Sequence, residues 1–384
     1  MSADPISSPA AIRIDLGAIF VSLELSKSTW LVTSLSPGSE KMSRHPVPGG
    51  DMSALLGCLD ALRDKAQARE GRRYPVIAIQ EAGLDGFWIH RALVSENWIT
   101  SHVVDAASIA VSRRHRRAKT DRIDGEMLVR TLMAWMRGEP RVCSMVRVPT
   151  IEEEDRRRIG RERKALVKER TVHVNRIKGL LFTVGIRDYV PNRRDRRERL
   201  EELRTGDGKP LPRHLKAQLS RELDRLELLA EQIKRVEAER DDLCAAANET
   251  APQVMLTTLK GIGPEFANVL ASEGLFRHFD NRRQVAAYAG LAPSPWRSGS
   301  IDREQGVSKS GNPRLRTTMI QLSWLWLRFQ PDSALARWFQ ERISHSGGRG
   351  KKVAIVALAR KLLVAFWKFA MSGVVIEGAI MAKA

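Results

Sequence analysis

Residues 17–35, which read GAIFVSLELSKSTWLVTSL, decide the fold of the N-terminal part of the chain. Gly17–Glu24 and Thr29–Leu35 are rich in aliphatic, aromatic and β-branched residues, and this composition predicts two strands. The short polar stretch between them, Leu25–Ser28, predicts the turn that joins the strands. The first predicted strand therefore ends on a carboxylate, Glu24, beside a turn.

Strands and helices continue to alternate up to residue 137. Lys41–Val47 predicts a third strand, and residues 51–69 carry apolar side chains at helical spacing. Pro75–Gln80 is a short apolar run of the kind found in buried strands. The remaining predicted elements are a helix at Leu84–Ser95, a strand at Ile99–Asp105 and a long helix at Asp121–Arg137. The order β-β-β-α-β-α-β-α is that of a ribonuclease H-like domain, a fold analogy that a functional site has to support.

The composition changes after residue 150. Residues 151–250 are mostly charged and aliphatic, and apolar residues recur every three or four positions from Leu219 to Leu243, interrupted only at Arg240. This spacing predicts a long amphipathic helix, either one arm of a coiled-coil hairpin or an ordinary helix that faces a core. Gly185–Pro212 is the predicted turn between two such arms. We expect an α/β plus α protein, with a leader (1–16), a ribonuclease H-like domain with a mixed sheet (17–150), a basic helical or coiled-coil segment (151–250) and a mainly helical domain (251–384).

Length and composition exclude several classes of protein. The 384 residues suffice for two or three domains, and a hydrophobic fraction of 43% is that of a folded protein. Three cysteines far apart in the sequence argue against a disulfide framework and against a Cys-rich zinc site. The apolar stretches near both ends are interrupted by charged residues, which argues against a signal peptide and a membrane span. We expect a cytoplasmic protein with no membrane contact.

The charge of the chain favours nucleic acid as a partner. The formal net charge is +19 and the isoelectric point is near 10.4. Residues 113–122 hold six Lys and Arg with one acid, and residues 155–170 hold eight with three acids. Further basic clusters lie at 192–199 and 349–361. One such cluster alone would be a solvated helix face, but four clusters on so basic a chain favour nucleic acid.

Four carboxylates occupy positions that suit a metal site. Glu24 ends the first strand, Glu81 follows the PVIAIQ strand, and Asp121 and Asp124 begin the long helix on one face. In a ribonuclease H-like sheet these elements converge, and carboxylates there hold the Mg²⁺ of phosphodiester chemistry. Each acid taken alone has a structural alternative, such as capping a helix start. Asp15 and Asp105 are competing candidates.

The C-terminal part contains a glycine turn and a serine-containing stretch. Leu259–Leu270, LKGIGPEFANVL, predicts a hairpin of two helices whose backbone N–H groups suit a phosphate, or simply a tight turn. Residues 288–316 are rich in Pro, Gly and Ser and predict a loop, which nonetheless carries five Lys and Arg. Ser298 follows Arg297, a setting that suits attack on a phosphate by a hydroxyl. Its competitors are Ser294, Ser300, Ser308 and Ser310, and a flexible serine-rich loop is the alternative.

Several motifs together resemble one family. KTDRID at Lys119–Asp124 matches the pattern K-T-D-x-x-D, and QEAG at Gln80–Gly83 follows the PVIAI strand. GLAPSPWRSG…GVSKSGNPRLR matches G-L-x-P…S-G…I-x-K-x-G-x-x-x-L-R, and GRGKKVAIVALARKLL matches a closing basic helix. From about residue 17 to 370 the chain resembles the DEDD transposases of the insertion-sequence one-ten family, which are recombinases guided by a bridge RNA encoded beside the gene.

The resemblance implies a fold and a set of site residues. It implies a RuvC-like N-terminal domain, a coiled-coil insertion and a C-terminal transposase domain with Ser298 as the nucleophile. Glu24, Glu81, Asp121 and Asp124 would hold Mg²⁺, or Mn²⁺ in its place. Glu24 departs from the family's Asp, and its extra methylene extends its reach by about 1.5 Å, the length of one carbon–carbon bond. The residues expected to bind nucleic acid are Arg113, Arg114, Arg116, Arg117, Lys119, Arg297, Arg303, Lys309, Arg314, Arg316, Lys351 and Lys352.

The resemblance also implies partners and an assembly. The partners would be element DNA, target DNA and the guide RNA, and the protein would be associated with the nucleoid when bound to DNA. The assembly would be a dimer or tetramer in which one protomer's acids meet another's serine.

Two alternatives remain open at this point. The first is a metal-dependent nuclease resembling a Holliday-junction resolvase, which would hydrolyse DNA with activated water and would not need Ser298. The second is a catalytically inactive nucleic-acid-binding relative, in which Glu24 marks a decayed site and binding depends on salt.

Overall fold

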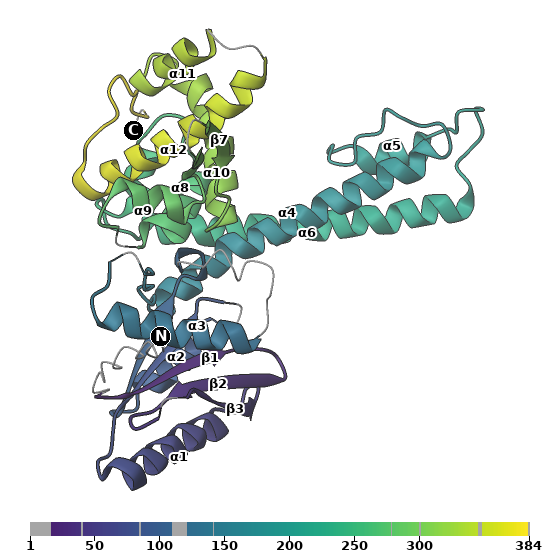
Figure 1. The fold of residues 1–384 in the computed structure, drawn as a ribbon. Coiled ribbons are helices and arrows are strands. Elements are labelled where there is room, and N and C mark those ends of the chain that lie inside the picture. Colours follow the sequence, from purple (N-terminus) through teal and green to yellow (C-terminus); the bar gives the residue numbers. More distant parts are fainter. Residues whose placement is uncertain are drawn as a thin grey trace, which may run out of the picture. The chain divides into compact units, whose positions relative to one another are not determined.

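The computed structural model describes residues 17–382 apart from 40, 84–85, 110–120, 141, 278, 299–300 and 345–347. For residues 107, 121–122, 295–298, 301–305 and 348–349 it describes the backbone alone. The chain divides into two compact units, Met1–Pro149 and Thr150–Ala384. These are called unit 1 and unit 2 and are described separately (Figure 1).

Unit 1 is built on a mixed five-stranded sheet with the order β3-β2-β1-β4-β5. The strands β1 (Ile19–Glu24), β2 (Thr29–Leu35) and β3 (Ser43–Pro48) pair antiparallel through short turns. The strands β4 (Val76–Glu81) and β5 (Ile99–Val104) run parallel to β1, because each is reached through a helical crossover. The predicted strands and their order in the chain are confirmed.

Helices cover both faces of this sheet, and strand alternation explains why. Ile19, Val21 and Leu23 of β1 face a core that includes side chains of α1 (Met52–Glu70) and α2 (Trp88–Val94). Phe20, together with Ile79 of β4, faces α3 (Asp121–Met136) instead. Because successive side chains of a strand point to opposite faces, β1 is buried on both sides.

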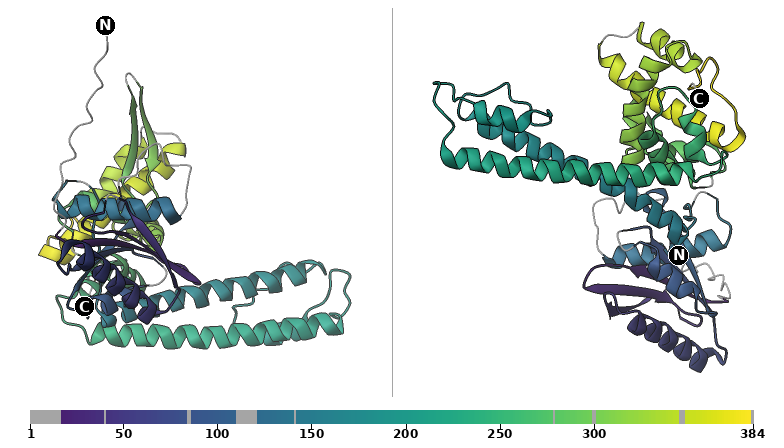
Figure 2. Two further views of the ribbon diagram at one scale, coloured as in Figure 1. Left: turned by 60° about the horizontal axis from the view of Figure 1, so that its bottom comes forward. Right: turned by 180° about the vertical axis from the view of Figure 1, so that it is seen from behind.

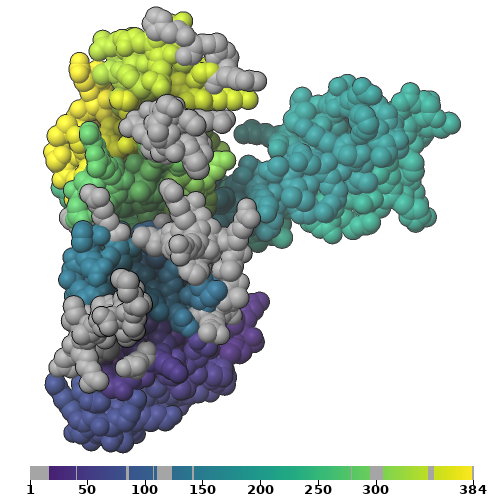
Figure 3. Space-filling model, in the orientation of Figure 1, coloured from purple at the N-terminus to yellow at the C-terminus, as the bar shows by residue number. Residues whose placement is uncertain are grey.

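Unit 2 begins with two long helices that form a hairpin. The first is α4 (Ile151–Phe182), which starts with a capping box of Thr150 and Glu153, and the second is α6 (Arg213–Ala245). Leu181, near the end of α4, shares a buried cluster with Leu219 and Leu223 of α6, so the helices are antiparallel. Figure 2 shows the pair side by side, and in Figure 3 it stands out from the rest of unit 2.

The predicted turn between the arms contains a short helix, α5 (Arg196–Glu202). Arg196 and Arg197 both donate hydrogen bonds to Glu227 of α6, and those from Arg197 are the main reason that the pKa of Glu227 is about 2. These ion pairs fix the connection against the hairpin.

The rest of unit 2 is mainly helical. Its core includes Trp326, Phe339, Leu358 and Phe366, all almost fully buried. Its elements are α7 (Pro252–Thr257), α8 (Pro264–Leu270), the π-helical turn η3 (Ala271–Leu275), α9 (Arg282–Tyr288), β6 (Pro293–Ser298), β7 (Ile301–Val307), α10 (Pro313–Phe329), α11 (Ala334–Ser344) and α12 (Gly348–Ser372). Within the described residues, none of the helices is both long and apolar enough to span a bilayer.

Two local predictions were wrong. Residues 288–316, expected to be a loop, contain the two-stranded hairpin β6–β7 and the start of α10. A ribbon of two strands has only edges, so prolines at 293 and 295 need not break it, and the pairing is irregular between them. The predicted helix at Leu84–Ser95 is shorter than expected, since α2 covers only Trp88–Val94.

The hairpin of α4 and α6 offers a matched test of burial. Leu223 is fully buried between the helices, whereas Leu228 on the same helix is 53% exposed. Replacing Leu223 with Ala should lower the free energy of opening of α6 by about 2–4 kcal/mol, and Leu228→Ala should change it by less than about 0.5 kcal/mol. Hydrogen exchange of α6 amides in the full chain measures both, and equal effects would contradict this packing.

Candidate active site

Two of the predicted acids end neighbouring strands of unit 1. The parallel ladder of β1 and β4 pairs Leu23 with Gln80, and Glu24 and Glu81 are the next residues of the two strands. Phe20 and Ile79 face α3, so strand alternation directs Glu24 and Glu81 to that same face. Both side chains are half-buried. The two carboxylates therefore lie at the same edge and on the same face of the sheet.

The first turn of α3 carries a third predicted acid and packs against β1. The hydroxyl of Ser22, two residues before Glu24, donates a hydrogen bond of 2.8 Å to the carbonyl of Gly125. A Cβ atom at Gly125 would come within 2.5 Å of the Thr33 hydroxyl, so the absence of a side chain allows α3 to approach the sheet. Asp124 directly precedes this contact. Asp121 begins the same helix, and its side chain lies outside the description.

The start of α3 packs against β1, but the acids that these elements carry do not form a metal site among the described side chains. Among the residues whose side chains are described, no group of three His, Cys, Asp or Glu could hold a metal ion. Of the competing acids, Asp15 lies outside the described residues, and Asp105 follows β5 one residue beyond the pair of Glu81 with Val104. The side chain of Asp105 therefore points to the opposite face of the sheet from that of Glu81. This favours Glu24, Glu81, Asp121 and Asp124 over Asp105.

The predicted nucleophile lies at the end of a hairpin in unit 2. Ser298 is the last residue of β6 and pairs with Ile301, the first residue of β7. Only residues 299 and 300 separate the two strands, so Ser298 is at the turn of the hairpin. Its side chain and those of Arg297 and Arg303 lie outside the description. Of its competitors, Ser294 is within β6, Ser308 and Ser310 follow β7 at its root, and Ser300 is not described.

The root of the hairpin is held by backbone contacts. The amide of Ser308 donates to the carbonyl of Ala292 at 2.9 Å, and that of Asn312 donates to the carbonyl of Tyr288 at 2.7 Å. Gly311 has a φ of +96°, and a Cβ there would collide with the Tyr288 carbonyl. Only glycine fits at position 311, where the backbone passes close to Tyr288. The family-like segments around residues 290 and 311 therefore meet in space and fix the base of the hairpin.

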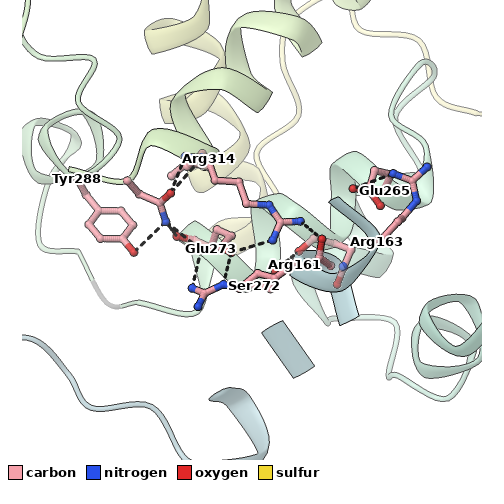
Figure 4. Close-up of polar contacts among 11 residues, drawn as sticks. Arg161, Arg163, Glu265, Ser272, Glu273, Tyr288 and Arg314 are labelled. Carbon is pink, nitrogen blue, oxygen red and sulfur yellow. Dashed lines mark hydrogen bonds and ion pairs between the residues drawn. The ribbon is translucent and has the colours of Figure 1, made fainter. Parts of the chain in front are cut away.

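A buried carboxylate ties this root to the rest of unit 2. Glu273, in the π-helical turn η3, is 3% exposed. It accepts hydrogen bonds from Arg161 of α4 at 3.1 Å, from Arg314 of α10 at 3.1 Å and from the amide of Asn312 at 3.0 Å (Figure 4). Asn312 also caps α10, because its side-chain oxygen accepts from the amides of Arg314 and Leu315. Glu273 thus joins three elements at the base of the hairpin.

The electrostatics of this network keep Glu273 ionised. Burial alone would raise the pKa of Glu273, but the hydrogen bonds from Arg161 and Asn312 and the nearby positive charges outweigh it, so the pKa lies below its ordinary value. Arg157 of α4 is also buried and lies 3.7 Å above the ring of Phe276, and burial lowers the pKa of its guanidinium. Arg314 also donates to the Gly160 carbonyl at 2.6 Å. The network is therefore a fixed ionic connection between α4 and the hairpin root.

The structure divides the predicted nucleic-acid contacts into three groups. Lys309, Lys351 and Lys352 are exposed, and Lys351 lies 5.6 Å from the ring centre of the exposed Trp324. Arg314 and Arg316 donate hydrogen bonds within unit 2, Arg314 to Glu273 and Arg316 to the Lys309 carbonyl at 2.7 Å. The Arg314 side chain is also only 11% exposed, so Arg314 is not part of the proposed surface. The others are outside the description: Arg113, Arg114, Arg116, Arg117 and Lys119 entirely, and Arg297 and Arg303 as side chains.

Sequence reasoning missed the residues that position the site. Gly125 and Ser22 set the approach of α3, and the one available signal was a glycine inside a helical pattern directly after Asp124. Glu273 gave no signal, because its partners Arg161 and Arg314 are 112 and 41 residues away in the sequence.

Comparison with known proteins identifies the family. The family model described as Transposase IS116/IS110/IS902 family matches residues 254–339, which include Glu273 and the β6–β7 hairpin. The chain is 68% identical over 385 residues to the "Putative transposase y4rJ" of Sinorhizobium fredii, with 97% of each protein covered. The chain belongs to the IS116/IS110/IS902 family of transposases. The predicted resemblance is confirmed at this level.

Two more distant relatives of this transposase have informative names. The transposase for insertion sequence element IS1111A of Coxiella burnetii is 30% identical over 224 residues, which are 57% of this chain and 59% of that protein. The pilin gene-inverting protein of Moraxella bovis is 32% identical over 111 residues, 28% of this chain and 34% of that protein. This transposase is therefore an enzyme whose substrate is DNA.

The close approach at Gly125 can be tested by a double-mutant cycle. Gly125→Ala should lower the free energy of unfolding of unit 1 by about 1–3 kcal/mol, because the new methyl group collides with Thr33. In a Thr33→Ala background the same change should cost almost nothing, since alanine favours helix by about 1 kcal/mol over glycine. Hydrogen exchange of α3 amides measures the four proteins. An undiminished cost in the Thr33→Ala background would contradict the proposed contact.

The Glu273 network predicts a specific dependence on pH. Because the folded-state pKa of Glu273 is lowered, its stabilising contribution is present above the unfolded value of about 4.3 and is lost as the pH falls through the folded value. Glu273→Gln should reduce the stability of α10 at pH 7 by about 3 kcal/mol and remove part of its acid sensitivity. Hydrogen exchange of α10 amides, followed from pH 7 down to acidic pH and corrected for intrinsic exchange rates, measures this dependence of stability on pH. The exposed Glu249→Gln is the control, and a pH profile parallel to wild type would contradict the role of Glu273.

Proposed function

We propose that this transposase cuts and rejoins DNA through a covalent serine–DNA intermediate, and that a guide RNA selects the sites. Ser298 is the proposed nucleophile, and Glu24, Glu81, Asp121 and Asp124 are the proposed carboxylate set of a RuvC-like domain. The observation that supports the proposal is that Glu24 and Glu81 end neighbouring parallel strands on the face towards α3, whose first turn, with Asp124, packs against β1. Acids contributed by elements far apart in sequence are typical of sites for metal-assisted phosphodiester chemistry.

The donor set fits Mg²⁺ or Mn²⁺. All four residues offer carboxylate oxygens, the ligands that hard divalent cations prefer. We assign Glu24, Glu81, Asp121 and Asp124 to this ion, which when bound would neutralise charge on the phosphate and lower the pKa of a coordinated hydroxyl.

The serine step balances without a further reactant. The hydroxyl of Ser298 loses its proton, its oxygen forms a bond to phosphorus, and the bond from phosphorus to the leaving deoxyribose oxygen breaks. That oxygen takes up a proton, so one phosphoester bond replaces another. Because no bond is hydrolysed, attack by a hydroxyl of a second DNA end can reverse the step and join the strands. The role of the protein is to place the serine, and the fixed hairpin root supports this role.

The surface of unit 2 supports binding of RNA and DNA and assembly. Lys351 beside the exposed Trp324 combines a cation with an aromatic face, an arrangement that suits nucleic acid. The helical hairpin exposes Val172, Phe182 and Leu228, which supports its use as a coiled-coil contact between protomers. We propose a dimer or tetramer in which the acids of one protomer act with Ser298 of another.

The proposal predicts a covalent adduct between protein and DNA. The test combines the purified protein, RNA transcribed from its genomic flanks, a duplex carrying the element end, and Mg²⁺, followed by quenching in denaturant. Wild type should form a protein–DNA adduct that Ser298→Ala and Glu24→Ala both abolish, because one removes the nucleophile and the other a metal ligand. Ser294→Ala and Ser308→Ala are matched controls that should retain the adduct.

Other outcomes separate the alternatives. Cleavage without an adduct, unaffected by Ser298→Ala, would favour a nuclease that uses activated water. An adduct that persists in Ser298→Ala would exclude this serine as the nucleophile. Salt-sensitive binding with no Mg²⁺-dependent product would indicate an inactive relative.

A further inference from the structure

A basic groove lies on unit 2 between α9, α12 and the segment that follows α12. Its volume is about 690 Å³. Arg282 and Arg283 line it from the first residues of α9, and Arg360, Lys361 and Lys368 line it from α12. On α12 these cations alternate with Val364 at a spacing of three to four residues, so they share one face of the helix. None of these residues belongs to the carboxylate set or to the serine hairpin.

The charge of the groove is poorly compensated. Within the described residues, no carboxylate forms an ion pair with Arg282, Arg283, Arg360 or Lys368, and the ammonium of Lys361 lies 4.6 Å from the ring centre of Trp338. The one acid in the lining is Glu377, which lies 3.8 Å from Arg337 outside the groove. Five cations facing one carboxylate favour a polyanion as the occupant.

The groove also has an exposed apolar wall. Val374 and Val375, which follow α12, are 58% and 46% exposed beside the cations. Covering these apolar side chains removes them from water and stabilises a complex. The phosphates on the outside of a duplex would not cover them. A single strand can place phosphates on the cations and turn its sugars and bases towards the apolar wall.

This wall is held in place by a buried side chain. Gln330 is fully buried, and its amide nitrogen donates to the carbonyls of Lys260 and Ile380, both at 2.8 Å. Its side-chain oxygen accepts from the amide of Ile380 at 2.7 Å. The amide of Ala334 donates to the carbonyl of Glu377 at 2.9 Å. The segment after α12 is thus fixed against α10 and α11, and the groove is preformed.

We propose that this groove binds an unpaired nucleic-acid strand. The cations of α9 and α12 contact its phosphates, and Val374 and Val375 contact its sugars and bases. The inference rests on the proposed function, because it takes nucleic acid as the partner. It adds a strand site on the same unit as the serine hairpin, so that a displaced or unpaired segment stays bound to the body that carries Ser298.

The test measures binding of a fluorescent oligothymidylate and of the same strand in a duplex by the full-length protein over a range of salt. Arg282→Gln, Arg283→Gln and Lys368→Gln are combined, since all three side chains are exposed and none forms an ion pair with another described residue. The matched control removes the same charge from exposed positions elsewhere in unit 2, at Lys178, Arg213 and Lys234. The groove variant should bind the single strand about tenfold more weakly, and its slope against the logarithm of salt should fall by about 2. The control should change little, and duplex binding should change less than single-strand binding.

Each other outcome overturns the inference. Equal weakening by both triple variants would mean that net charge alone sets binding, and equal weakening of duplex and single strand would exclude a site for an unpaired strand. If wild type binds no nucleic acid, the proposed function fails as well. A second measurement avoids variants: oligothymidylate should protect Lys361 and Lys368 of wild type from acetylation, but not Lys234, as read by mass spectrometry. If the protein binds the strand but Lys361 and Lys368 are not protected, the proposed strand site in the groove is wrong. The proposed serine chemistry would not be affected by that result.

Discussion

Unit 2 depends on the buried carboxylate of Glu273, which binds residues of α4 and of α10 and lies at the root of the β6–β7 hairpin. A two-stranded hairpin has little stability of its own, so its position is set by what holds its root. The charge of Glu273 is retained in the interior because Arg161, Asn312 and Arg314 supply hydrogen bonds that offset its burial. Loss of that charge would weaken the connections of α4, α10 and the hairpin root to one another at the same time.

Unit 1 solves a similar positioning problem with a close backbone approach. Ser22 and Gly125 bring the first turns of α3 to the carboxyl end of β1, and the parallel register sets Glu81 beside Glu24. The two units thus hold chemically different halves of the proposed reaction, the acids on a rigid sheet edge and the serine on a hairpin. The sheet edge of unit 1 and the base of the β6–β7 hairpin in unit 2 are both held by fixed contacts. A reaction that depends on positioning requires such fixed supports.

Sequence reasoning succeeded where one local pattern determines the structure. Apolar and β-branched runs predicted β1, β2, β4 and β5, helical spacing predicted α1 and α6, and the acids at strand ends followed from those assignments. It failed at residues 288–316, because Pro, Gly and Ser favour loops in general and the hairpin depends on contacts with residues far away. It also could not find Glu273, Arg161 or Gly125 as positioning residues. In a highly charged chain, the sequence does not show which charged residues are buried. The role of a glycine in close packing becomes apparent only when its neighbours in space are known.

The central claim, that Ser298 carries the DNA, is tested most directly by locating the bond. A quenched wild-type reaction would be digested with nuclease and trypsin, which cleaves after Arg297 and Arg303 and isolates residues 298–303. Fragmentation mass spectrometry then distinguishes Ser298 from Ser300 within this peptide. The account predicts a nucleotide remnant on Ser298. A remnant on Ser300 or on any other residue, or a fully cleaved substrate with no modified peptide, would contradict it.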